Sequence, residues 1–130
     1  MSKFHGIALG FATAALLAAA PGAASAAECE ELRLGSAISL TGKYATNGIH
    51  AKNGYEFAIQ KIKENGGIKI GDKCYNFNVT YYDDESKGDR GATLAERLIN
   101  QDKIQYMLGP YSSGLTKAIA PVSYTHLRAH

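Results

Sequence analysis

The chain has 130 residues, of which 45% are hydrophobic and 20% are charged. This composition is typical of a globular protein and excludes the disordered and collagen-like classes, and the length allows one domain at most. The 14 basic and 12 acidic side chains leave a net charge of only +2. Because proteins that bind nucleic acid use a basic surface to neutralise phosphates, we expect no nucleic-acid partner.

The first 26 residues have the organisation of a secretory signal peptide. Lys3 and His5 precede an uncharged run at residues 6–20, and residues 24–26 (Ala-Ser-Ala) give the pattern of a cleavage site. A membrane-spanning helix would need roughly 20 apolar residues, and this run is shorter. We therefore predict a cleaved signal peptide at residues 1–26 and an exported mature protein.

Two cysteines, Cys29 and Cys74, remain after the predicted cleavage. Lipid attachment at Cys29 is disfavoured because Glu28, rather than a small residue, precedes it. In an oxidising compartment two cysteines favour one disulfide, and two buried free thiols are the alternative. If the strands that follow these cysteines are parallel neighbours, both thiols lie at the same end of the sheet, opposite the ligand loops.

The spacing of apolar and turn residues predicts alternating strands and helices. In chain order the predicted elements are a strand at 32–40, a helix that begins with Thr46 or Asn47 as N-cap and ends at Glu64, a hairpin of strands 68–70 and 73–82, a helix at 89–101, a strand at 104–108, and a helix through Leu115, Ala118 and Ile119. This order predicts an α/β fold, a three-layer βαβ lobe whose parallel sheet is wound by right-handed crossovers. Ligands bind beyond the carboxyl ends of the strands of such sheets.

The segment at residues 109–116 follows a strand and opens a helix. Its Gly-x-x-x-x-Gly spacing is that of a phosphate loop, but Leu115 stands where the phosphate-contacting lysine belongs. The free N–H groups of the helix start and the hydroxyls of Ser112, Ser113 and Thr116 still make a site for a weaker anion, such as one carboxylate. The alternative is that the serines only cap the helix.

Two tyrosines, Tyr44 and Tyr111, lie in loops that should converge above the sheet. There they could wall a small organic ligand, or they could only cover the rim of the sheet.

An acidic pair, Asp83-Asp84, ends the second long strand. A metal site there is disfavoured because no third carboxylate is suitably placed, and we interpret the pair as a cap favoured by the dipole of the next helix. Ser39 and Thr41, at the end of the first strand, either line the ligand cleft or satisfy local backbone groups.

Five short motifs and their order carry a resemblance that covers about residues 32–122. They are Ser39-Leu40-Thr41-Gly42, Glu64-Asn65-Gly66-Gly67-Ile68, Asp83-Asp84, Ala95-x-x-Leu98-Ile99 and Gly109-x-x-x-Ser113. With the signal peptide, they resemble the type I periplasmic solute-binding proteins, and most of all the leucine/isoleucine/valine-binding family of ABC importers.

The resemblance implies a monomeric periplasmic receptor that closes two lobes on an amino acid and presents it to an ABC permease. It implies no enzymatic activity, no cofactor and no metal. Ser113 matches the family position that holds the ligand carboxylate, with the backbone amides near Ser112 and Gly114 beside it. Tyr44 and Tyr111 would shape the cleft wall. Asn47 stands where the family often offers an aromatic residue, which opens the possibility of a polar amino acid or amide as ligand.

The resemblance also divides the chain. Residues 27–122 correspond to an incomplete N-terminal lobe, and residues 123–130, which lack helical apolar spacing, are predicted to be a non-native tail. A ligand-sensing domain of a receptor or regulator with the same fold is the alternative function. An α/β enzyme of flavodoxin-like type is disfavoured because the phosphate-loop lysine and an acid–base pair are both missing.

Overall fold

The structure is a computed structural model that describes residues 29–127, so the predicted signal peptide and the last three residues lie outside the described part. Within these residues seven elements follow one another: β1 (Glu30–Ile38), α1 (Ala45–Glu64), β2 (Ile68–Ile70), β3 (Lys73–Asp83), α2 (Gly88–Asn100), β4 (Tyr106–Met107) and α3 (Ser113–Leu127). The predicted alternation of strands and helices is confirmed.

The sheet has the strand order β2-β3-β1-β4, with β1 in the centre. β1 pairs in parallel with β3 from Glu30 opposite Tyr75 to Ile38 opposite Asp83, and it pairs in parallel with β4 at Leu34 and Gly35. β2 is antiparallel to β3 because the two form the predicted hairpin. The sheet is therefore mixed: β1, β3 and β4 are parallel, as predicted, and the predicted hairpin adds β2 antiparallel at one edge.

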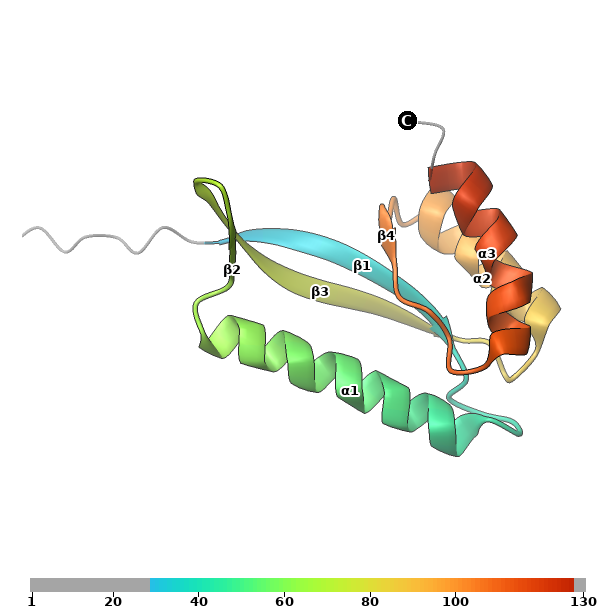
Figure 1. Cartoon of the computed structure of the whole chain (residues 1–130). Helices are drawn as coiled ribbons and strands as arrows, with labels where there is room; N and C mark the ends of the chain where they lie inside the picture. Colours follow the sequence, from blue (N-terminus) through green and yellow to red (C-terminus); the bar gives the residue numbers. More distant parts are fainter. Residues whose placement is uncertain (1–28, 128–130) are drawn as a thin grey trace, which may run out of the picture.

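The helices lie on both faces of the sheet, which gives the three layers predicted (Figure 1). α1 covers one face, whereas α2 and α3 pack against each other on the opposite face. The buried hydrophobic residues come from β1, α2, α3 and the segment before β4: Ala37, Ile38, Ala95, Leu98, Ile99, Ile104, Leu115 and Ile119. No helix within residues 29–127 has both the length and the apolar character needed to cross a membrane.

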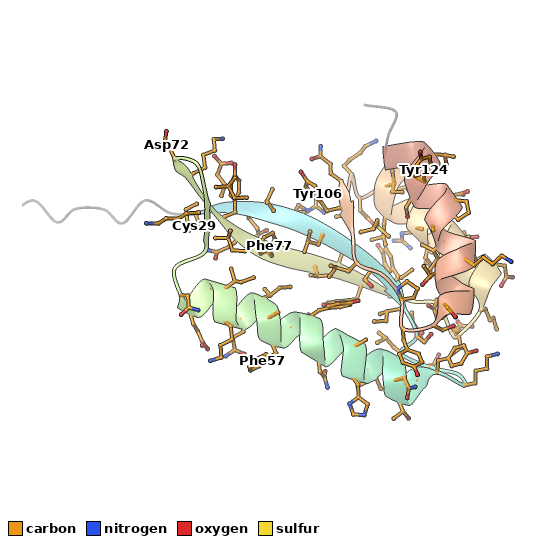
Figure 2. All side chains as sticks on the ribbon, viewed as in Figure 1. Cys29, Phe57, Asp72, Phe77, Tyr106 and Tyr124 are labelled. Carbon is orange, nitrogen blue, oxygen red and sulfur yellow. A yellow bond between two sulfur atoms is a disulfide. The ribbon has the colours of Figure 1, made fainter. Side chains whose placement is uncertain are left out.

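The apolar residues that recur along one side of α1 lie toward the sheet. Tyr55, Ile59 and Ile62 line an apolar hollow of about 240 Å³ with Phe77 of β3, whereas Phe57, 63% exposed, points away from the sheet (Figure 2). α1 therefore packs less closely on its face than α2 and α3 do on theirs.

Several element boundaries differ from those predicted, and β1 begins and ends two residues earlier than the strand predicted at 32–40. The N-cap of α1 is Tyr44, not Thr46 or Asn47, because the chain turns earlier, at Gly42, whose carbonyl accepts the Ala45 N–H. β4 is shorter than the strand predicted at 104–108 because it pairs with only two residues of β1. α3 continues to Leu127 and so includes the first five residues of the segment predicted to be a non-native tail, although that segment lacks helical apolar spacing.

Cys29 and Cys74 form a disulfide that joins the start of β1 to the start of β3, with their Cα atoms 4.6 Å apart. Both sulfur atoms pack against Gly67, because a Cβ added at this residue would be only 2.7 Å from each of them. Figure 2 shows Cys29 at the end of the sheet that also carries the hairpin. Closing a 45-residue separation stabilises a fold by about 4 kcal/mol in the chain-entropy model.

Two glycines in α1 differ sharply in their surroundings. Gly48, in the first turn, is buried against the end of β1, and an added Cβ would overlap the carbonyl oxygen of Ser39. Gly54, further along the helix, has nothing within 4 Å of an added Cβ. Only Gly48 is therefore required for close contact between helix and strand.

We predict opposite effects of alanine at these two positions. Gly48→Ala should lower the free energy of unfolding by about 1–3 kcal/mol because the helix start must move away from β1. Gly54→Ala should raise it by roughly 0.5–1 kcal/mol because alanine is the better helix former. Urea unfolding of both variants beside the parent protein measures the difference, and equal effects would contradict the packing described here.

Candidate functional site

The loops that follow β1, β3 and β4 meet at one end of the sheet, where α1, α2 and α3 begin (Figure 1). Because β1, β3 and β4 are parallel, their carboxyl ends meet at this edge, where open α/β sheets bind their ligands. The disulfide lies at the opposite end. The predicted ligand-binding residues, which lie in the loops after β1 and β4 and at the starts of α1 and α3, therefore gather at this end of the sheet.

The two carboxylates that end β3 join the loop after β3 to the loop after β1. Asp84 is fully buried, and its Oδ1 accepts hydrogen bonds from the Ser39 hydroxyl at 2.6 Å and from the Ser86 N–H at 2.7 Å. The interpretation of the pair as a cap of α2 is wrong, because the N-cap is Lys87 and it has no side-chain cap bond. Among residues 29–127 no three potential metal ligands cluster.

Asp83 makes the same connection closer to solvent. Its Oδ1 accepts the N–H groups of Leu40, Thr41 and Glu85 at 2.9–3.1 Å, and its Oδ2 accepts the Thr41 hydroxyl at 2.7 Å. Partial burial alone would raise the pKa of the Asp83 carboxyl, but these hydrogen bonds to its charged form outweigh burial and lower the pKa below its ordinary value. The Ser39 and Thr41 hydroxyls thus bind the two carboxylates that end β3, and within the described residues neither satisfies a local backbone group, which was the second role considered for them.

The two loop tyrosines converge as predicted. The rings of Tyr44 and Tyr111 have centroids 6.2 Å apart and planes inclined at 54°, and the Lys43 ammonium lies 4.7 Å from the centre of the Tyr44 ring. Tyr111 is 50% exposed and Tyr44 is half-buried. The pair forms an aromatic edge that is still open to solvent on one side.

The start of α3 divides its hydroxyl groups between two roles. The Ser112 hydroxyl accepts the Leu115 N–H at 3.4 Å, and the Thr116 hydroxyl donates to the Ser112 carbonyl at 3.0 Å, so both serve the helix. Ser113 is exposed, and its hydroxyl makes no hydrogen bond with any other residue of the part described. The first N–H groups of a helix, here those of Ser113 and Gly114, have no partner inside the helix.

Asn47 lies in the first turn of α1, half-buried and three residues after Tyr44. It shares this end of the molecule with the two tyrosines and the start of α3. Sequence reasoning missed Ser86, which has hydrogen bonds to both Thr41 and Tyr44. Nothing in the local sequence around Ser86 signals these contacts, because they join positions 42–45 residues apart.

A profile of the periplasmic binding protein family matches residues 31–126, nearly the whole of the described chain. The chain belongs to this family. That result confirms the resemblance identified from the motifs. The predicted domain boundary at residue 122 stays a prediction.

The relatives that match are named for branched-chain amino acids. The chain is 31% identical over 105 residues to the Leu/Ile/Val-binding protein homolog 3 of Brucella melitensis and 30% identical over 92 residues to the Leu/Ile/Val-binding protein BraC3 of Rhizobium johnstonii. These matches cover 81% and 71% of this chain. The relatives are named as solute-binding proteins, which fits, at the level of the family, the expectation of no enzymatic activity.

Solved structures share the fold. The branched-chain amino acid binding protein LivJ of Streptococcus pneumoniae, in complex with isoleucine, is 25% identical, with a TM-score of 0.66 over 75% of this chain. A solute-binding protein of Rhodopseudomonas palustris in complex with 3,4-dihydroxybenzoic acid is also 25% identical, with a TM-score of 0.59 over 73%. The chain spans about a quarter of the length of these proteins and of the curated relatives, 24–27%.

The hydrogen bonds to the Asp83 carboxylate should make the stability of the fold depend on pH. Because its pKa is lowered in the folded protein, the carboxylate stabilises the fold above its unfolded-state pKa of about 3.9, and this stability is lost as the pH falls through the folded value. The melting temperature should therefore fall more steeply as the pH drops below about 4 in the parent protein than in Asp83→Asn. Asp72→Asn, in the exposed hairpin turn, is the control. Parallel curves for the parent protein and Asp83→Asn would contradict the role of Asp83.

Proposed function

We propose that this chain is part of a monomeric periplasmic receptor that captures an amino acid and delivers it to an ABC permease. The observation that carries the proposal is the juxtaposition of an open aromatic edge, Tyr44 and Tyr111, with a helix start whose Ser113 hydroxyl is uncommitted. An aromatic wall beside an anion-binding helix terminus suits a small organic carboxylate.

In this proposal the ligand carboxylate binds at the start of α3. The Ser113 hydroxyl and the N–H groups of Ser113 and Gly114 donate hydrogen bonds to it, and the helix dipole favours the negative charge. Ser112 contributes by holding the first turn in place through its bond to Leu115. Isoleucine and 3,4-dihydroxybenzoic acid, the ligands named for two similar structures, both carry a carboxyl group, which supports a site built around this group.

The rest of the ligand lies against the tyrosines. Tyr44 and Tyr111 bury apolar parts of the ligand, and Asn47 offers an amide to a polar side chain. This combination favours a polar amino acid or an amide as much as a branched-chain ligand. The names of the relatives favour the branched-chain class. A panel of amino acids is therefore needed to decide the ligand.

The test is calorimetric titration of the complete polypeptide that carries this sequence with such a panel. We expect one class of amino acid to bind, and Ser113→Ala to weaken its binding about ten- to a hundredfold, as loss of a hydrogen bond to a charged group does. Thr93→Ala removes a hydroxyl that only bonds the Asp89 carbonyl of α2, so its affinity should equal that of the parent protein.

Two results would contradict the proposal. Absence of heat with every amino acid would refute an amino-acid receptor. Parental affinity in Ser113→Ala would refute the placement of the carboxylate at the start of α3, because the exposed hydroxyl would then have no part in binding.

A further inference from the structure

Ser86, in the loop after β3, connects directly to the loop that carries Tyr44. Its hydroxyl donates a hydrogen bond to the Thr41 carbonyl at 2.8 Å and accepts the Tyr44 N–H at 3.0 Å. The first bond holds the loop at its start, and the second holds the residue directly before α1. One side chain therefore bridges both ends of the turn between Thr41 and Tyr44.

The position of Ser86 is itself fixed by the core. Its N–H donates to Oδ1 of the fully buried Asp84 at 2.7 Å, and the Lys87 N–H donates to the Asp84 carbonyl at 2.9 Å. Glu85 and Ser86 have φ values of 52° and 63°, so the turn between β3 and α2 follows a left-handed path. The Ser86 hydroxyl is thus presented by a turn anchored on a buried carboxylate.

The two loops touch without an intervening side chain. At Gly42, with φ of +80°, an added Cβ would lie 2.6 Å from the Glu85 carbonyl oxygen and 2.7 Å from the Ser86 hydroxyl. The absence of a side chain at Gly42 allows Ser86 to reach across to the backbone. Movement of the turn at Ser86 would therefore pass directly to the loop before α1.

We propose that Ser86 is a positioning residue for ligand binding, and that its hydroxyl sets the placement of Tyr44 in the cleft wall. The proposal rests on the proposed function. While Ser86 holds the backbone N–H of Tyr44, the centroid of the Tyr44 ring lies 6.2 Å from that of the Tyr111 ring. The aromatic edge is therefore formed before the ligand arrives. Without the hydroxyl, the ligand must order the loop as it binds, which lowers the apparent affinity.

The direct test is Ser86→Ala in the complete polypeptide, with amide hydrogen exchange measured by NMR. The Tyr44 N–H loses its acceptor, so we expect its exchange to accelerate at least tenfold while amides in the centre of β1 and β3 keep their parental rates. Thr93→Ala again serves as the control and should leave the Tyr44 amide unchanged. An unchanged Tyr44 amide in Ser86→Ala would overturn the proposal.

A double-mutant cycle separates positioning from general stability. We expect Ser86→Ala to weaken amino-acid binding about three- to tenfold in the parent protein and to have no effect in a Tyr44→Ala background, where there is no ring to position. A purely structural role for Ser86 would weaken binding equally in both backgrounds, and that result would overturn the proposal.

The two measurements distinguish this proposal from the proposed function. If the parent protein binds no amino acid, the proposed function is refuted, while the exchange rate of the Tyr44 amide still decides whether Ser86 holds the loop. If the parent protein binds an amino acid and Ser86→Ala binds it equally well, the receptor assignment stands and the positioning role is refuted.

Discussion

The hydrogen bond between the Ser39 hydroxyl and the Asp84 carboxylate, 2.6 Å long and without solvent exposure, is the contact around which the functional end of the sheet is arranged. A buried carboxylate is unfavourable unless hydrogen bonds compensate for its lost hydration. Asp84 receives two at Oδ1, one from the loop after β1 and one from its own turn, whereas its buried Oδ2 has no hydrogen-bond partner within residues 29–127. Two loops that are far apart in sequence are thereby held at one relative position.

The central strand β1 is held at both of its ends, by different chemistry. At its start the disulfide between Cys29 and Cys74 joins it covalently to β3. At its end the side chains of Asp83 and Asp84 bind the loop that follows it. Nine parallel residue pairs lie between these two points. The loops that carry Tyr44 and Ser86 therefore project from a fixed pair of strands.

The sequence was sufficient for what depends on local spacing. The apolar period of α2 predicted its bounds to within one residue, and the Gly71-Asp72 turn predicted the hairpin. The sequence was insufficient for features that depend on contacts between distant loops. Asp84 has the pattern of a helix cap and instead binds Ser39, and Ser86 carries no signal of its contact with Tyr44. The meeting of Tyr44 with Tyr111 was predictable, because parallel strands bring their carboxyl ends together.

In the proposed function, the start of α3 receives the carboxylate of an amino acid beside an aromatic edge, Tyr44 and Tyr111, that the loops hold in place. A crystal structure of the complete polypeptide with its tightest-binding amino acid tests this most directly. We expect a carboxylate oxygen within hydrogen-bond distance of the Ser113 hydroxyl and the first amides of α3, with the ligand against Tyr44 and Tyr111. A ligand whose carboxylate is bound elsewhere, with Ser113 facing solvent, would contradict it.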